Sequence, residues 1–309
     1  MKNIKFFGSI PAIVTPFKKN GDLDLLALDK LVDYQLKGGV DAIVVCGSTG
    51  EAATLNDEEY IAVIKTVVRK VATRRIRVPV IAGAGSNDTK KAIHFSQLAK
   101  EAGADALLHV TPYYNKPTGN GLVLHFQEIS KAVNLPIIIY NVPGRTGSNV
   151  LPQVIVRIAR EVPAVVAVKE ASGSLNQMME IIKEVAKNGP KDFVVLSGDD
   201  ALALPLIALG GKGCISVVCN EVPKLFSEMI HLALKDNLKE ARKLHYAMLD
   251  LMNINFIESN PIPVKTALGM MGIITESLRL PLTFIEDKNR VLVEKVLKAM
   301  GLTKLIQIK

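Results

Sequence analysis

One lysine directly follows a run of apolar residues, where its amine could act as a nucleophile. Lys169 ends the run Ala164–Val168, and a short continuous apolar run is typical of a buried strand. Burial disfavours the ammonium form of a lysine, so a neutral amine becomes available to attack a carbonyl carbon. A single lysine in such a place more often snorkels to solvent or pairs with a carboxylate. Schiff-base chemistry therefore needs support from neighbouring residues.

A tyrosine at the end of another apolar run could handle the protons of such a reaction. Tyr140 follows the run Leu135–Ile139. A phenol can accept and return protons when its hydroxyl is linked to further hydroxyls, and Ser48 and Tyr114 are suitable links. A buried tyrosine can also serve only to pack its ring and satisfy its hydroxyl. The pattern favours Tyr140 as a proton shuttle beside Lys169.

Two further segments could bind carboxylates. The segment Gly47–Glu51 reads GSTGE, and its glycines would let the backbone amides of Ser48 and Thr49 approach an anion. It lacks the Gly-Lys-Ser/Thr of a nucleotide-binding loop, and it could also be an ordinary capped turn. Arg145, between two glycines of a loop, could hold a second carboxylate with its guanidinium group, although a lone loop arginine is often only solvated.

Repeated sequence phrases indicate the elements that must bring these residues together. Three segments join the end of a helix to an apolar run through small residues, namely 38–44, 102–108 and 210–216. Three others place a proline just before the run, at Pro79, Pro136 and Pro163. With 10–14 and 193–196 there are about eight short apolar runs separated by segments of helical periodicity. This pattern predicts a (β/α)8 TIM barrel, in which catalytic groups lie at the carboxyl ends of the strands.

The strand phrases end near residue 236. We therefore expect a barrel domain over 1–236 and a small helical C-terminal domain over 237–309. Within the latter, residues 238–249 carry apolar side chains in helical register, and a final helix is expected around 289–300.

Composition excludes several classes of function. The chain of 309 residues is 49% hydrophobic and 22% charged, as expected of a protein with a large core. Its net charge of +8 is dispersed among acidic residues, so we expect no nucleic-acid partner. The three cysteines and five histidines show no metal-ligand spacing, and we expect buried thiols and no metal. No apolar stretch reaches the roughly 20 residues of a membrane span. With no signal-peptide pattern either, we expect a cytoplasmic protein.

The ordered segments GSTGEAATL, TPYYNKP, YNVPGRTG, VKEASG, SGDD and GCISV resemble the dihydrodipicolinate synthase family, and the resemblance covers nearly the whole chain. It implies that Lys169 forms an imine with pyruvate, with no separate cofactor, and that Ser48, Tyr140 and Tyr114 relay protons. The tyrosine matching Tyr114 is lent across a subunit interface in this family. The resemblance therefore implies a dimer as the minimum active unit and a homotetramer as the usual assembly.

The resemblance also assigns binding residues. Thr49 and the amides of its loop would bind the pyruvate carboxylate, and Gly198 and Ile215 would line the pocket. The first relay residue is usually threonine, whereas here it is Ser48, which keeps the hydroxyl but loosens its rotamer.

Arg145 bears on the second substrate. A synthase needs an arginine for the carboxylate of L-aspartate 4-semialdehyde, whereas sialate lyases and many sugar-acid aldolases lack it. The expected activity is therefore the condensation to 4-hydroxy-tetrahydrodipicolinate, the first committed step of diaminopimelate and lysine biosynthesis. A pyruvate-dependent aldolase for N-acetylneuraminate or 2-keto-3-deoxy acids is an alternative, and a non-catalytic keto-acid-binding barrel is a second one.

Feedback inhibition by lysine is expected to be weak or absent. Asn87 and Tyr113 match the allosteric pattern of the family. Responsive members carry histidines and a glutamate where this chain has Asp57, Tyr60 and Lys91. Because Lys91 would repel a cationic ligand, we predict an inhibition constant for lysine above the sub-millimolar range.

Overall fold

The computed structural model describes residues 6–75 and 77–303 and contains a nearly closed parallel barrel. Its eight strands are β1 (Gly8–Pro11), β2 (Ile43–Val45), β3 (Val80–Gly83), β4 (Ala106–Val110), β5 (Ile137–Asn141), β6 (Val165–Glu170), β7 (Val194–Ser197) and β8 (Gly213–Ser216). Neighbours pair in parallel in the order β1-β8-β7-β6-β5-β4-β3-β2. A parallel bridge between Ala12 and Val44 brings the two ends of the sheet together. The predicted TIM barrel is confirmed.

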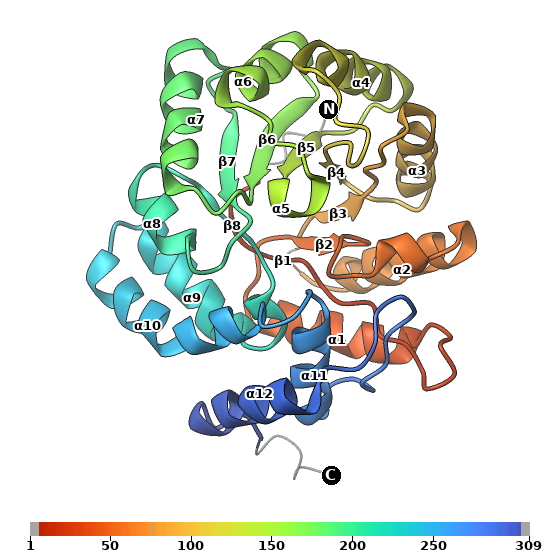
Figure 1. Cartoon of the computed structure of the whole chain (residues 1–309), viewed down its shortest axis with the longest axis vertical. Helices are drawn as coiled ribbons and strands as arrows, with labels where there is room; N and C mark the ends of the chain where they lie inside the picture. The colour runs from red at the N-terminus through yellow and green to blue at the C-terminus, as the bar shows by residue number, and fades with distance from the viewer. Residues whose placement is uncertain (1–5, 76, 304–309) are drawn as a thin grey trace.

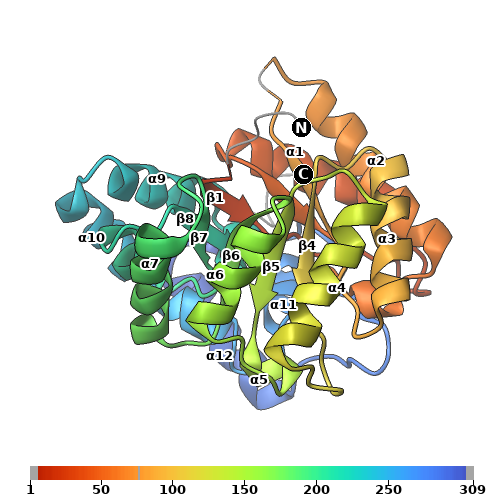
Figure 2. The same cartoon turned by 90° about the horizontal axis from the view of Figure 1, so that it is seen from above.

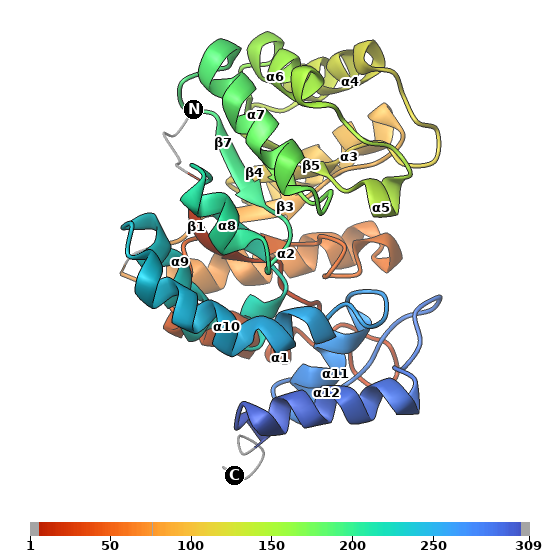
Figure 3. The same cartoon turned by 60° about the vertical axis from the view of Figure 1, so that its left-hand side comes forward.

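Helices surround the barrel (Figure 1, Figure 2). They are α1 (Leu25–Lys37), α2 (Asp57–Ala72), α3 (Thr89–Glu101), α4 (Gly119–Ala132), α5 (Pro143–Thr146), α6 (Pro152–Glu161), α7 (Leu175–Asn188), α8 (Ala203–Ala208) and α9 (Pro223–Leu234), with the 3-10 turns η1 (Ala52–Thr54) and η2 (Val218–Asn220). Three further helices follow, α10 (Leu238–Ile254), α11 (Ile262–Met270) and α12 (Asp287–Ala299). Figure 3 shows α10, α11 and α12 gathered at one end of the molecule.

Alternation along the strands divides the core into two layers. Inward-facing residues such as Ile138, Ala167 and Ile215 fill the barrel, whereas Ile139 and Val168 pack between the sheet and the helices. Because successive side chains of a strand point to opposite faces, Tyr140 shares the inner face with Ile138.

The structure corrects two predicted strand boundaries. The run 10–14 was expected to form a strand, but β1 spans Gly8–Pro11 and β7 is shifted one residue beyond 193–196. Gly8 pairs with Gly213 of β8, and both glycines have positive φ angles, +88° and +147°. A pattern of hydrophobic residues cannot predict this pairing of two glycines, so it could not predict where β1 begins. Ala12 to Val14 are buried, and their amides bond to Ser216, Val44 and Asn220 instead.

The C-terminal helices pack on the barrel rather than apart from it. Helix α10 lies against α8 and α9, and α11 contacts η2 after β8. The final helix was expected near 289–300 and is observed as α12. The boundary at residue 236 falls in the turn between α9 and α10.

Candidate active site

Lys169 and Tyr140 lie side by side at the carboxyl ends of adjacent strands. They are register partners in β5 and β6, and Lys169 Nζ lies 4.2 Å from the centroid of the Tyr140 ring. Both are buried, with exposed fractions of 6% and 8%. The structure thus brings together the two residues that the sequence singled out first.

The amine of Lys169 makes no ion pair and no hydrogen bond with any described residue. Its burial rules out snorkelling to solvent, and the missing counter-ion rules out a carboxylate pair. Lys265, the other buried lysine of the described chain, contrasts with it because its amine lies 2.5 Å from a carboxylate oxygen of Glu51. Lys169 is therefore the buried lysine of the described chain whose amine is not committed to a hydrogen bond or an ion pair.

Gly198 provides the space that the Lys169 side chain occupies. A Cβ atom at this position would come within 2.9 Å of Lys169 Cε and 2.6 Å of Ala171 Cβ. The Gly198 amide also donates to the Glu170 carbonyl at 2.7 Å, so β7 lies close beside β6 here. A side chain at residue 198 would displace Lys169.

A cavity of about 310 Å³ opens at Lys169. Its lining includes five of the residues expected at the site, Tyr140, Ser48, Thr49, Arg145 and Gly198. Ile215 is not among the lining residues but is fully buried in the barrel interior, and the wall near β8 is formed by Val217. The role of Ile215 in the pocket stays a prediction.

The loop Gly47–Glu51 contains backbone amides with no acceptor among the described residues. Gly50 and Glu51 donate to the carbonyls of Gly47 and Ser48, but no described residue accepts from the amides of Ser48 or Thr49. Ser48 is exposed in the cavity, while Thr49 is buried. Two adjacent unpaired N–H groups form a suitable anion site. The loop is followed by the turn η1, and α2 begins only at Asp57.

Asn260 was not assigned a role from the sequence, yet it joins both groups expected to bind carboxylates. Its side-chain amide donates to Thr49 Oγ1 at 2.9 Å, and its carbonyl accepts from Arg145 at 3.0 Å. Asn260 and Phe256 line the cavity from the segment between α10 and α11. They lie more than 200 positions from Ser48 in the chain, so no local pattern could place them at the site.

On the outer face of the same strands, a buried amide and carboxylate fix the local geometry. Asn141 and Glu170 are register partners next to Tyr140 and Lys169. Asn141 donates to Glu170 at 2.9 Å and accepts from the Val150 amide at 3.1 Å. This pair therefore links β5 and β6 to the segment that carries Arg145.

Tyr114 does not reach the cavity of its own chain. Its side chain is 89% exposed, its φ angle is +70°, and its amide donates to the Thr146 carbonyl at 3.3 Å. No hydrogen bond joins the hydroxyls of Ser48, Tyr140 and Tyr114 in the described chain. The relay assigned to these three residues stays a prediction.

The residues expected for an allosteric site are partly assembled. Asn87 donates to the Tyr113 carbonyl at 3.2 Å. Tyr60 is buried and donates to the Gly83 carbonyl, Asp57 pairs with His94, and Lys91 is exposed on α3. Weak or absent lysine inhibition stays a prediction.

Over the described ranges, no three or more His, Cys, Asp or Glu side chains are placed to hold a metal ion. Cys46, Cys214 and Cys219 are buried free thiols, as expected. Within residues 6–75 and 77–303, no helix is both long enough and apolar enough to cross a membrane.

Comparisons with known proteins agree on one family. The model of the dihydrodipicolinate synthetase family matches residues 5–300. The 4-hydroxy-tetrahydrodipicolinate synthase of Maridesulfovibrio salexigens is 51% identical over 297 residues, covering 96% of this chain and 99% of the relative. That of Methanocaldococcus jannaschii is 48% identical with the same coverage.

Solved structures give the same result. A dihydrodipicolinate synthase from Thermotoga maritima superposes with a TM-score of 0.93 at 43% identity, covering 97% of this chain and 100% of that one. A structure described as the first monomeric dihydrodipicolinate synthase variant also has a TM-score of 0.93 and 43% identity, covering 96% of this chain and 97% of that one.

Proposed function

The chain belongs to the dihydrodipicolinate synthetase family, and on this premise we propose that it condenses pyruvate with L-aspartate 4-semialdehyde to 4-hydroxy-tetrahydrodipicolinate through an imine on Lys169. This reaction is the first committed step of diaminopimelate and lysine biosynthesis. The observation that carries the assignment to Lys169 is its buried amine, which has no counter-ion among residues 6–75 and 77–303 and faces Tyr140 at the cavity.

The first half of the reaction concerns pyruvate. The amine of Lys169 attacks the keto carbon, and loss of water leaves an imine. The amides of Ser48 and Thr49, which have no internal acceptor, bind the pyruvate carboxylate. The methyl carbon loses a proton to give the enamine, and the hydroxyl of Tyr140, which lines the cavity, accepts that proton as it passes its own to the next hydroxyl of the relay. The protonated imine serves as the electron sink, so the proposal requires no separate cofactor.

The second half concerns the aldehyde. The enamine carbon attacks the aldehyde carbon, and Arg145, which lines the cavity, holds the carboxylate of the semialdehyde. The amine of the bound product then displaces Lys169 by transimination, which closes the ring and frees the lysine. Two further hydroxyls complete the proton relay. One is that of Ser48 in the same chain, and the other is that of Tyr114 from a neighbouring subunit. This role for Tyr114 requires at least a dimer, and we propose a homotetramer.

An assay with two aldehyde classes tests the substrate assignment. We expect turnover of the semialdehyde and no cleavage of N-acetylneuraminate or 2-keto-3-deoxy acids. Arg145→Ala should raise the KM for the semialdehyde about tenfold or more, because a charge-assisted contact is lost, and should leave borohydride trapping of pyruvate intact. Sugar-acid cleavage at a comparable rate would support the aldolase instead. Pyruvate binding without turnover of either class would support a binding protein.

A further inference from the structure

A buried ion pair connects the loop proposed to bind pyruvate to helix α11. Lys265 on α11 is fully buried, and its amine donates to Glu51 at 2.5 Å and to the Thr15 carbonyl at 3.0 Å. It also lies 4.3 Å from the centroid of the Phe17 ring. Burial lowers the pKa of Lys265, and the carboxylate of Glu51 opposes that shift. Two apolar side chains at these positions would avoid the desolvation cost of the charges, so the pair calls for a role beyond packing.

Glu51 is the last residue of the loop and is anchored at both carboxylate oxygens. One oxygen accepts from Lys265, and the other accepts from the Arg279 amide at 3.1 Å. Its backbone is in the left-handed region with φ +52°, and so is that of Cys46, which precedes the loop. Side-chain-bearing residues adopt this conformation only where the surrounding structure holds them. The loop is therefore held at both ends.

The same contacts reach the residues that face the cavity. The Glu51 amide donates to the Ser48 carbonyl at 3.1 Å, which fixes the turn carrying the unpaired amides of Ser48 and Thr49. Thr15 adds a second link, because its carbonyl accepts from Lys265 and its hydroxyl donates to the Gly50 carbonyl at 2.7 Å. A shift of the ion pair would move these amides.

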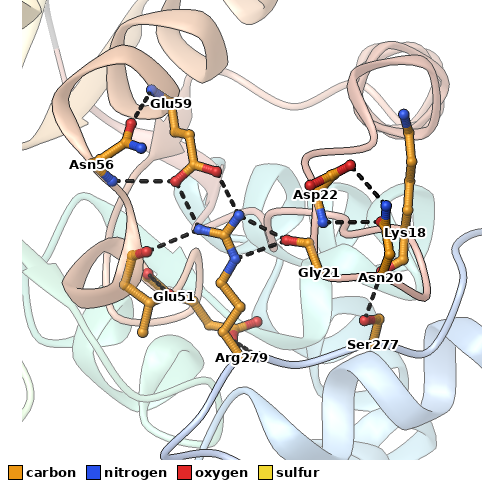
Figure 4. A network of polar contacts seen from close by, with 10 residues as sticks. Lys18, Asn20, Gly21, Asp22, Glu51, Asn56, Glu59, Ser277 and Arg279 are labelled. Carbon is orange, nitrogen blue, oxygen red and sulfur yellow. Dashed lines mark hydrogen bonds and ion pairs between the residues drawn. The ribbon is translucent and has the colours of Figure 1, made fainter.

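Arg279 links Glu51 to helix α2 and to the segment that precedes α1. Figure 4 shows its guanidinium group between Glu59 and the carbonyl of Gly21. It also donates to the Thr54 carbonyl, and Glu59 forms a capping box with Asn56 at the start of α2. Residues far apart in the chain thus converge on Glu51.

We propose that Glu51 and Lys265 are positioning residues that hold the Gly47–Glu51 loop so that the amides of Ser48 and Thr49 point at the pyruvate carboxylate. This inference rests on the proposed function, because it takes pyruvate as the ligand of the loop. Neither side chain touches the substrate. We expect their main effect on pyruvate, because Glu51 belongs to the loop and bonds directly to Lys265, whereas Arg145, which receives the aldehyde, is bonded to Asn260.

The test measures the pyruvate concentration that gives half-maximal borohydride labelling of Lys169. Glu51→Gln and Lys265→Met each remove one charge at nearly constant size, and Glu51→Asp keeps the charge but shortens its reach. Lys70→Met is the matched control, since it breaks an ion pair with Asp29 between α1 and α2, outside the cavity.

We expect Glu51→Gln and Lys265→Met to raise the half-saturating pyruvate concentration about tenfold or more, which corresponds to one weakened charge-assisted contact. Labelling at saturating pyruvate and the KM for the semialdehyde should stay within about twofold of wild type. Glu51→Asp should have an intermediate effect, and Lys70→Met none. If Lys265→Met does not fold, the two Glu51 variants decide.

Folded Glu51 variants with unchanged pyruvate dependence would overturn the inference, even if their melting temperatures fell, because the pair would then be only structural. Failure of the wild type to label at Lys169 is a different result. It would overturn the proposed function, and this inference with it.

Discussion

At the scale of single residues, the chemistry depends on the difference between two buried lysines. Lys265 has a carboxylate partner, whereas Lys169 has none among the described residues. The amine of Lys265 is committed to its ion pair, whereas the amine of Lys169 lies at the cavity beside Tyr140. The structure therefore favours Lys169 over Lys265 as the nucleophile, a distinction that depends on contacts between distant segments.

The contact between Gly198 and Lys169 gives a prediction at this scale. Gly198→Ala should lower both the rate of imine formation and kcat by about tenfold or more, because the new methyl group would come within 2.9 Å of Lys169 Cε. The measurement is single-turnover borohydride trapping with pyruvate, together with kcat. Gly121→Ala on α4 is the control, since its Cβ would meet nothing nearer than 3.3 Å. Unchanged trapping in Gly198→Ala would show that Lys169 has another way to reach the keto carbon.

At the scale of elements, α9 is tied to the start of the barrel by a titrating contact. His231 Nε2 lies 2.7 Å from Asp41 Oδ2, which also accepts from the Ser9 amide of β1. The hydrogen bond to Asp41 raises the pKa of His231 above its usual 6.5, and partial burial opposes the shift. Because the folded state binds the proton more tightly, the stabilisation is fully present below pH 6.5 and is lost as the pH rises through the raised pKa.

We therefore expect His231→Gln to destabilise the fold at pH values below 6.5 and to have progressively less effect as the pH rises. The loss should be less than about 1 kcal/mol, since the imidazole is partly exposed. Urea unfolding of both proteins across this range measures it. A difference between the two proteins that does not change with pH would contradict the assigned titration.

Much of the barrel could be predicted from short-range patterns. Apolar runs preceded by proline or glycine mark the strands because each strand is short and buried on both faces. The start of β1 was missed because it depends on the pairing of Gly8 with Gly213. Lys169, Tyr140 and the loop of Ser48 could be predicted because each directly follows a recognisable apolar run. Asn260 and the Glu51–Lys265 pair could not, because their contacts join segments far apart in the sequence.

At the scale of the whole molecule, the proposed assembly depends on Tyr114. The residue is 89% exposed in the single chain, so its side chain is free to enter the site of a neighbouring subunit. If a neighbouring subunit receives this tyrosine, Tyr114→Phe should lower kcat about a hundredfold, the lower end of the range for general acid–base catalysis.

Dimers that combine two different variants test whether Tyr114 acts on the site of the neighbouring subunit. Tyr114→Phe and Lys169→Ala should each be nearly inactive alone. Co-refolded together, they should regain up to about a quarter of wild-type activity, because half of randomly formed dimers are mixed and each contains one complete site. No recovery, with mixed dimers verified by native mass spectrometry, would mean that Tyr114 acts within its own chain.

The proposed reaction begins with the capture of pyruvate by Lys169 as an imine. The most direct measurement is borohydride reduction in the presence of pyruvate, followed by peptide mass mapping of the wild type and of Lys169→Arg. We predict a single reduced pyruvate adduct on the peptide containing Lys169, with both the adduct and condensation lost in the variant. An adduct on another lysine, or condensation at full rate in Lys169→Arg, would contradict the account.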